Sequence, residues 1–271
     1  MESATGALAG HTAKVLATTS APSRYTKRLN GTRRRKIMYA VGAVCCLILG
    51  FTIGHEFLIS FAVFALVALF DRVRLKYKLN PDAQAASDSF VESFKQAASS
   101  ERVWMIDHRG HVSNSYQQRT NAGKDTVIHT EHASATTRAR DFVVNLPVPT
   151  LKASGRSPYF LPDTIIVQYG RRFAELAYHD VSVISQTLRT TEHGPVPEDA
   201  QQVGMTWTHV NKDDGPDHRF KTNPTVPILL YDEVVFSNKA REFESEWQFS
   251  RTGSVTEWVA KLHARGATDE S

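Results

Sequence analysis

Residues 37–70 read IMYAVGAVCCLILGFTIGHEFLISFAVFALVALF, an apolar stretch whose only acidic or basic side chains are those of His55 and Glu56. A single helix over the whole stretch would be about 51 Å long, whereas the hydrocarbon core of a bilayer is about 30 Å thick. It would also place Glu56 deep in lipid, where an unpaired carboxylate is strongly disfavoured. We therefore predict two helices, over residues 37–53 and 57–70, joined as a transmembrane helical hairpin.

Basic segments flank this hairpin, which we assign to residues 31–78. The sequence RYTKRLNGTRRRK precedes it at residues 24–36, and DRVRLKYK follows it at residues 71–78. Because basic flanks stay on the cytoplasmic side, we predict a multi-pass protein of the cell inner membrane with both termini in the cytoplasm. Residues 1–30 are predicted to be a flexible basic tail, and the basic flanks to contact anionic headgroups of membrane lipids. A buried helical hairpin in a soluble protein is the alternative.

Charge is divided unevenly along the chain. Residues 1–80 carry 12 Lys and Arg against 3 Asp and Glu, and residues 81–271 carry 20 against 25. A nucleic-acid-binding protein would carry its basic patch on the folded domain, so no nucleic acid is expected as a partner. The cysteines, Cys45 and Cys46, are neighbours in the apolar stretch, and we expect them to fill space there without forming a disulfide.

Residues 81–271 are predicted to form a cytoplasmic α+β domain. It begins with a helix that starts after Asn80. Short β-rich segments separated by turns follow, at residues 102–106, 112–116, 125–129, 141–144, 158–169, 171–178, 181–190, 203–211 and 227–237. The last segment, SVTEWVAKLHARG, predicts an amphipathic helix with four apolar side chains on one face: Val255, Trp258, Val259 and Leu262. A β-rich antiparallel domain with such a C-terminal helix is similar to the pleckstrin-homology arrangement, and an unrelated α+β roll is the alternative.

Two pairs of histidines are candidate metal ligands. They are His108 and His111, which follow Asp107, and His129 and His132, which flank Glu131. Imidazole and carboxylate groups bind zinc where they converge. In an extended strand, however, residues three apart point to opposite faces, so exposed loop histidines explain the pattern equally well. We therefore predict no metal and no cofactor, and the convergence of the two pairs is left open.

The segment NKDDGPDHRFKTNPTVP, residues 211–227, is the most distinctive part of the domain. It lacks the register of a calcium-binding loop, and its Asp-Gly-Pro-Asp sequence is typical of a tight turn. An ordered structural loop, a loop that binds a ligand or partner, and a catalytic acid cluster are the three interpretations. The candidate binding residues are Asn211, Lys212, Asp214, Asp217, His218, Arg219 and Asn223.

Three segments carry a resemblance to a known family. They are YFLPDTIIV, YHDV and TWTHVNKDDGPDHRF, the last followed by Asn223. This pattern resembles an uncharacterised bacterial family of membrane-anchored domains across residues 103–250, although His218 stands where the family has arginine. The family has no established activity, so the resemblance implies only that residues 215–220 and Asn223 form a shared structural or binding loop.

The common signatures of catalysis are missing from the sequence. It has no Gly-rich phosphate loop and no G-x-S-x-G nucleophile elbow. We therefore favour a membrane-anchored cytoplasmic binding or adaptor module with no evident catalytic signature, which recruits a protein or a lipid headgroup through the loop of residues 211–223. The first alternative is a membrane-tethered metal-dependent hydrolase or nuclease that uses Asp213, Asp214, Asp217 and His218. A homo-oligomer packed through Gly50 and Gly54 is the second.

Overall fold

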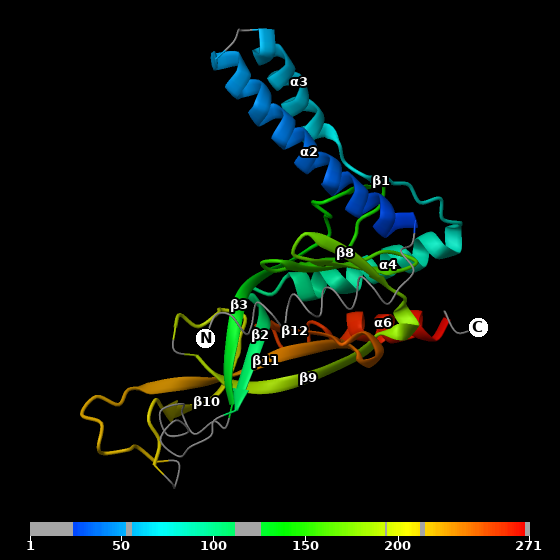
Figure 1. The fold of residues 1–271 in the computed structure, drawn as a ribbon. Coiled ribbons are helices and arrows are strands. Elements are labelled where there is room, and N and C mark those ends of the chain that lie inside the picture. The colour runs from blue at the N-terminus through cyan, green and yellow to red at the C-terminus, as the bar shows by residue number, and fades with distance from the viewer. Residues whose placement is uncertain (1–23, 53–55, 112–125, 193, 212–214, 269–271) are drawn as a thin grey trace.

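The computed structural model of the chain describes residues 24–52, 56–111, 126–192, 194–211 and 215–268 (Figure 1). Its helices are α2 (Arg24–Thr52), α3 (Glu56–Phe70), α4 (Pro81–Ala98), α6 (Thr256–Thr268), η1 (Tyr178–Asp180) and η2 (Lys239–Arg241). Its strands are β1 (Arg74–Leu75), β2 (Val103–His111), β3 (Thr126–Thr136), β4 (Val143–Val144), β5 (Thr150–Lys152), β6 (Arg156–Phe160), β7 (Ile165–Tyr169), β8 (Arg172–Leu176), β9 (Ser182–Thr191), β10 (Gln201–Trp207), β11 (Thr225–Asn238) and β12 (Phe243–Phe249). The structure confirms the α+β class, with a large antiparallel sheet and a few helices.

Ten of these strands form one antiparallel sheet, in the order β10-β11-β12-β2-β3-β5-β6-β7-β8, with β9 also paired to β11. Strand β11 is the longest, and its registers show that β9 lies along one edge while β10 and β12 lie end to end along the other. Strand β3 pairs with β2 over its first part and with β5 over its last part. It therefore carries the sheet from one half of the domain to the other.

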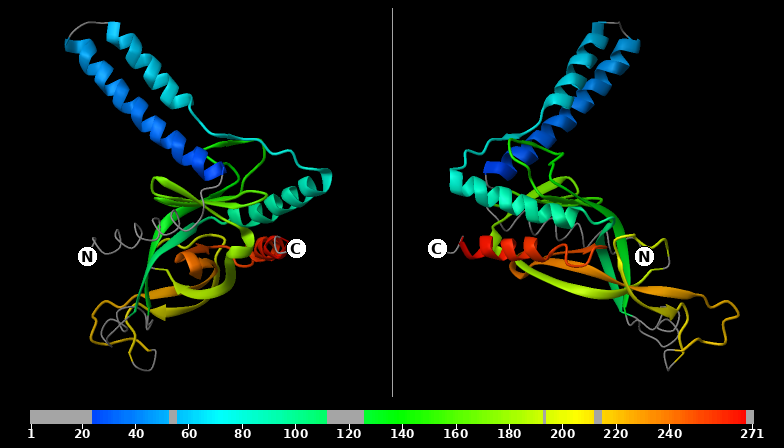
Figure 2. Two further views of the ribbon diagram at one scale, coloured as in Figure 1. Left: turned by 45° about the vertical axis from the view of Figure 1, so that its right-hand side comes forward. Right: turned by 180° about the vertical axis from the view of Figure 1, so that it is seen from behind.

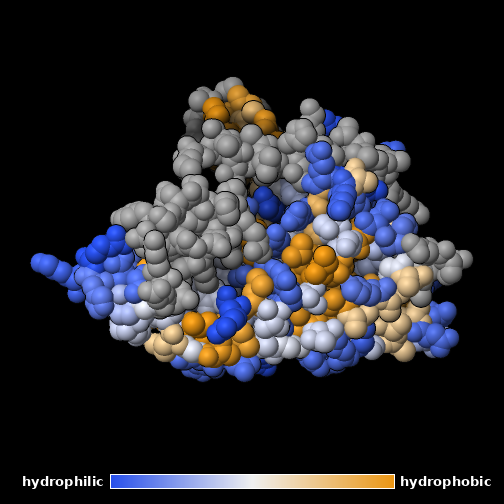
Figure 3. All heavy atoms as spheres, turned by 90° about the horizontal axis from the view of Figure 1, so that it is seen from below, coloured by the Kyte–Doolittle hydropathy of each residue, from blue (hydrophilic) through white to orange (hydrophobic). Residues whose placement is uncertain are grey.

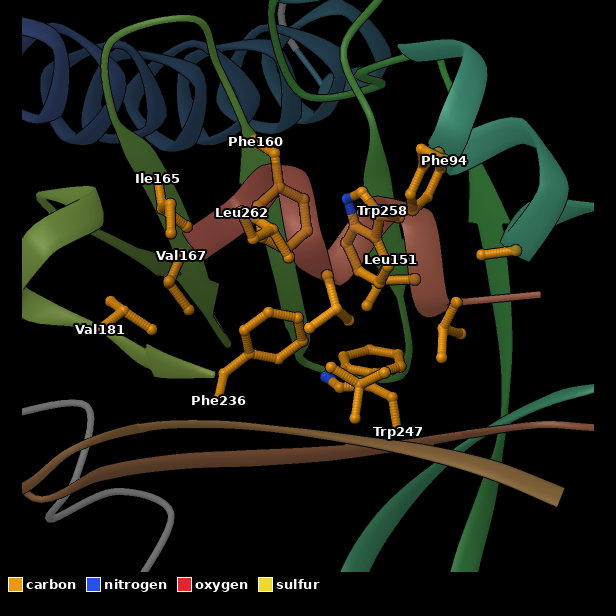
Figure 4. Packing of buried hydrophobic residues seen from close by; sticks show 14 of the residues in the cluster. Phe94, Leu151, Phe160, Ile165, Val167, Val181, Phe236, Trp247, Trp258 and Leu262 are labelled. Atoms are coloured by element: carbon orange, nitrogen blue, oxygen red, sulfur yellow. The ribbon is translucent and has the colours of Figure 1, made fainter. Parts of the chain in front are cut away.

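The C-terminal helix α6 supplies the centre of the main core (Figure 4). The Trp258 ring is fully buried, and its centroid lies 5.0 Å from the ring of Phe94 on α4 and 5.3 Å from the ring of Phe160 on β6. Phe236 on β11 also packs against it. The amphipathic helix predicted from the sequence therefore joins both halves of the sheet and α4 in one core.

A second, smaller core covers the opposite face of β6, β7 and β8. It contains Leu29 of α2, Val73 and Leu75 of the segment after α3, and Tyr159 of β6. The short strands β1 and β4 pair in parallel beside it. Residues 24–30, predicted as part of a flexible tail, are therefore helical and packed against the domain; the rest of that predicted tail lies outside the described residues.

Helices α2 and α3 pack against each other as a hairpin that projects away from the sheet (Figures 1 and 2). The aromatic rings of Tyr39 and Phe64 meet between them, with centroids 6.4 Å apart. In the parts of the chain that the structure describes, no helix is both long enough and apolar enough to cross a membrane. The hairpin itself forms as predicted, but these helices do not support the transmembrane spans predicted for residues 37–53 and 57–70.

Candidate functional site

The loop between β10 and β11 is closed by the side chain of Asn223. Its Oδ1 accepts a hydrogen bond from the backbone N–H of His209 (2.9 Å), and its Nδ2 donates to the carbonyl of the same residue (2.7 Å). An asparagine amide has the donor and acceptor of a peptide group, so Asn223 continues the strand pairing beyond the end of β10. The Phe220 ring stacks on the His209 ring from the other end of the loop, at a centroid distance of 3.8 Å.

Asp217 is buried, and its carboxylate is paired within the loop. Its carboxylate accepts hydrogen bonds from the backbone N–H of Arg219 (3.2 Å) and from Nε of the same arginine (2.9 Å), and it also pairs with Nη2. Asn211 closes the preceding turn, because its Oδ1 accepts from the backbone N–H of Gly215 (2.8 Å). The hydrogen bonds of Asn211, Asp217 and Asn223 therefore shape the loop.

The structure brings four of the seven predicted binding residues into direct hydrogen bonding within this loop: Asn211, Asp217, Arg219 and Asn223. His218 lies beside them, and the side chains of His218 and Arg219 are both exposed. Lys212, Asp213 and Asp214 lie outside the described residues, so their predicted roles stay predictions. The described part of the loop matches the structural interpretation and presents the Arg219 guanidinium and the His218 ring at its surface.

The two histidine pairs lie on neighbouring strands, since β2 and β3 pair with His108 opposite His129. Nothing is described of the side chains of His108 and His111. The acids next to the pairs have other partners: Asp107 forms an ion pair with Arg156 (3.3 Å), and Glu131 accepts from the backbone N–H of Ser154 (2.9 Å). Within the described residues, no group of three or more His, Cys, Asp or Glu side chains is placed to hold a metal ion.

The base of the hairpin is fastened to the domain by side chains that the sequence did not single out. Asn30 of α2 makes two hydrogen bonds to the backbone of Phe173, one to the carbonyl (3.0 Å) and one from the N–H (2.9 Å). Asn145 does the same to the backbone of Tyr77, at 2.9 Å and 2.8 Å. Together with Asn223, these are three asparagines that each bind both backbone groups of one distant residue. Asn30 joins α2 to strand β8 of the sheet, and Asn145 joins the segment after α3 to the segment after β4.

Asp163, the last residue of the YFLPD segment, also holds the hairpin base. Its Oδ1 accepts a hydrogen bond from the hydroxyl of Tyr77 (2.7 Å), and its Oδ2 accepts one from the hydroxyl of Tyr25 (3.4 Å). Burial, and then the Asp163 carboxylate, raise the pKa of the Tyr77 hydroxyl, and the same two causes raise that of Tyr25. Both phenols therefore stay protonated as donors, and the hairpin keeps a fixed attachment to the domain.

Two hollows lie where the hairpin meets the domain. One is a groove of about 620 Å³ lined by apolar side chains of α2, with Lys36 and Arg171 as the charged members of its lining. The other has a volume of about 280 Å³, and basic side chains from α2 and from the segment after α3 dominate its lining. Cationic side chains therefore lie at the base of the hairpin, next to the point on α2 where its apolar part begins.

Comparison of the chain with models of known protein families, with curated proteins and with solved structures gives no match. The resemblance drawn from the YFLPD and GPD-x-RF segments therefore stays a prediction.

Proposed function

We propose that the protein is a membrane-anchored binding or adaptor module. In this proposal the hairpin of α2 and α3 is embedded in the lipid bilayer, and the α+β domain is held at the cytoplasmic surface of the inner membrane. Because both ends of a hairpin emerge on the same side, the proposal places both termini in the cytoplasm.

One observation carries the membrane part of the proposal: the hairpin exposes the apolar side chains that a folded domain would bury. Met38 on α2 is 70% exposed and Ile59 on α3 is 72% exposed. Others on the same two helices are also exposed: Ile37, Val41, Val44, Ile48, Val63, Phe64, Leu66 and Val67. Burial of apolar surface stabilises by about 25 cal/mol per Å², so a lipid environment would stabilise this surface strongly. Apolar surface of this kind marks a membrane or protein contact.

The sheet exposes apolar residues in a different way. Figure 3 views the molecule from the side opposite the projecting hairpin, and hydrophobic residues on that face are interrupted by hydrophilic ones. The two hairpin helices instead expose apolar side chains on successive turns. We take this difference as support for lipid contact at the hairpin and for a protein partner at the domain.

The depth of insertion is limited by helix length. The 15 residues of α3 correspond to about 22 Å, less than the ~30 Å of a bilayer core. Val73 and Leu75 do not extend this apolar length, because both are buried against the domain. The proposal therefore requires insertion from the cytoplasmic side, and it does not depend on whether the turn reaches the opposite surface.

The binding part of the proposal rests on the loop between β10 and β11. Asn211, Asp217 and Asn223 form hydrogen bonds that hold the shape of this loop. This favours a loop that binds a partner through its exposed side chains over a catalytic acid cluster. Among the predicted binding residues that the structure describes, Arg219 and His218 have exposed side chains, and a partner would contact these two. A pleckstrin-homology-like arrangement is part of this proposal; the sheet closed by α6 and its buried Trp258 supports it.

The test is fractionation of the full chain expressed in bacterial cells, with washes in high salt and then in alkaline carbonate. The hairpin variant is Val63→Lys/Leu66→Lys, and the matched control is Ile184→Lys/Met205→Lys. The four original side chains are similarly exposed, at 55%, 57%, 57% and 52%. Each lysine at the centre of an apolar helix disfavours insertion by about 2.5–3.5 kcal/mol.

We expect the wild type and the control to stay in the membrane pellet and the hairpin variant to move to the supernatant. Release of the wild type by the carbonate wash would overturn the membrane proposal. Equal retention of the hairpin variant and the control would overturn it as well, because the lysines would then meet no lipid.

A further inference from the structure

A basic hollow is formed at the base of the hairpin by two segments that are far apart in the sequence. Arg28, Thr32 and Arg35 of α2 line one side, and residues 71–74 after α3 line the other. Thr32 and Val73 are buried and form the floor, whereas the arginine side chains are exposed at the rim. The hollow has a volume of about 280 Å³, which is room for a compact polar group.

One of the four arginines that line the hollow is already paired. Arg35 donates from Nε to Oδ2 of Asp71 (3.1 Å) and from Nη2 to Oδ1 (3.4 Å), and its Nη2 also donates to Thr32 (2.9 Å). This pair joins α2 to the end of α3 and fixes the shape of the hollow. Asp71 is the one acid in the lining, so the lining carries a net charge of +3 from four arginines and one aspartate.

The other three arginines have no acidic partner within the described part of the chain. Arg28, Arg72 and Arg74 are exposed around one small hollow and form no ion pair there. A guanidinium group presents paired N–H donors that match the oxygens of a phosphate group. Three such groups around one hollow would repel each other in the absence of an anion, and a bound phosphate would remove that repulsion.

We propose that this hollow binds the phosphate headgroup of one anionic membrane lipid. The inference rests on the proposed membrane insertion, which brings the lipid to the site. Arg35 is two residues before Ile37, the first exposed apolar residue of α2, and this corresponds to about 3 Å along the helix axis. The hollow therefore lies at the level where an inserted hairpin would leave the bilayer, which favours a lipid headgroup over a free phosphate.

The experiment counts the lipids that the full chain retains in detergent micelles, by native mass spectrometry. The micelles are doped either with phosphatidylglycerol, which is anionic, or with phosphatidylcholine, which has no net charge. The test variant is Arg72→Gln/Arg74→Gln. The control, Arg189→Gln/Lys239→Gln, removes the same charge from exposed positions on β9 and η2.

We expect the wild type and the control to retain one phosphatidylglycerol and no phosphatidylcholine. The affinity of the test variant for phosphatidylglycerol should fall roughly 30-fold, because each basic residue near a headgroup contributes about a fivefold factor. The variant Arg72→Lys/Arg74→Lys keeps the charge but loses the paired donors, so we expect its loss of affinity to lie between those of the control and the test variant. A thermal unfolding curve for each variant separates loss of binding from loss of folding.

Three results would overturn the proposal. The first is equal retention of both lipids by the wild type, and the second is equal loss in the test variant and in the control. The third is displacement of the lipid by millimolar inorganic phosphate, which would assign the hollow to a free phosphate. Failure of this proposal is distinct from failure of membrane insertion: an inserted hairpin with an empty hollow stays in the carbonate-washed pellet and retains no lipid selectively.

Discussion

Helices α3 and α6 have similar lengths, 15 and 13 residues, but differ in how they meet their surroundings. Helix α6 buries Trp258, Val259 and Leu262 on one face, and its other face is polar. Helix α3 has no polar face beyond its first residues, and Ile59 and Leu66 are exposed although nothing in its sequence favours contact with water. A helix that is apolar all round requires apolar surroundings on every side. The comparison shows that the domain buries the apolar side chains of α6 but does not bury those of α3.

Helix α2 combines a segment that is buried against the domain with a segment that exposes apolar side chains. Its first turns resemble α6, because Thr26 and Leu29 are buried and Leu29 is part of the second core. Its later turns resemble α3, because Met38 and Val41 are exposed. The change occurs across the basic residues 33–36, so the boundary between protein core and proposed lipid contact falls where the cations lie.

The largest expected effect is on the α6 side of the comparison. Replacing a large buried aromatic side chain by alanine costs about 3–5 kcal/mol, so Trp258→Ala should lower the free energy of unfolding of the full chain in detergent by that amount. Trp258→Phe should retain most of the stability, because the indole Nε1 has no hydrogen-bond partner among the described residues. Denaturant titration followed by circular dichroism measures both.

The matched change on α3 is Ile59→Ala, which removes an exposed apolar side chain. We expect it to lower the free energy of unfolding by less than about 0.5 kcal/mol, the usual range for substitutions at surface positions. A loss as large as that of Trp258→Ala would mean that α3 packs on protein, and the comparison between the two helices would then be wrong.

The next effect concerns the junction between the hairpin and the domain. Asn30→Ala removes a side chain that satisfies both backbone groups of Phe173, and each unsatisfied group costs about 1–3 kcal/mol where water does not replace the bond. We expect a loss of about 2 kcal/mol in the free energy of unfolding, with faster hydrogen exchange at the start of β8. Asn30→Asp should be at least as destabilising, because a carboxylate oxygen would face the Phe173 carbonyl.

If hydrogen exchange in β8 stays slow in both variants, the attachment of α2 to the domain does not depend on the two hydrogen bonds between Asn30 and Phe173. The other contacts of the hairpin base, such as those of Leu29, Asn145 and Asp163, would then be sufficient to hold it.

A smaller effect is expected in the loop between β10 and β11. Asn223→Ala removes two hydrogen bonds to the backbone of His209 in a partly exposed segment, where water replaces part of what is lost. The expected loss of stability is about 1 kcal/mol, with faster hydrogen exchange confined to residues 207–211. Lys221→Ala, which changes an exposed side chain of the same loop, is the control. Exchange that rises equally in both variants would contradict the structural role of Asn223.

Sequence patterns predicted elements whose periodicity is long and regular, and missed contacts that depend on the tertiary fold. Helix α6 was predicted because apolar residues recur with helical spacing over several turns, and the hairpin was predicted from the length of its apolar run. Strand β12 was missed although it supplies Trp247 and Phe249 to the core. The single strand predicted for residues 158–169 is in fact two strands, β6 and β7, because the Pro162-Asp163 turn ends the first.

The candidate loop was located by its Asp, Gly and Pro content, but the roles of its residues were not predictable from that. Asn223 could be singled out because it lies within the loop motif. Asn30 and Asn145 could not be singled out. An isolated asparagine in a sequence gives no sign that its amide oxygen and nitrogen will both bond to the backbone of one distant residue. The basic hollow was likewise visible only as two separate flanks, since their meeting depends on how the segment after α3 packs on α2.

The smallest expected effect is a pH dependence at the junction. Burial on β8 raises the pKa of the Glu175 carboxyl above its ordinary value; a hydrogen bond from Thr164 and the charge of Arg241 oppose this shift, and Asp163 adds to it. Between the ordinary and the raised value the folded protein holds this proton while the unfolded chain has lost it. The contribution of Glu175 to the free energy of unfolding is therefore fully present below the ordinary pKa and decreases as the pH rises through the raised one.

Glu175→Gln removes this titration, so the difference in stability between wild type and variant should shift against the wild type as the pH rises through that range. Denaturant titrations of the full chain at a series of mildly acidic pH values measure it, and Glu244→Gln, which changes an exposed carboxylate on β12, is the control. Glu175 is two residues from Phe173, where Asn30 attaches α2. A pH dependence that disappears in Asn30→Ala would therefore show that the hairpin base supplies the burial, whereas one that persists would assign the burial to the sheet alone.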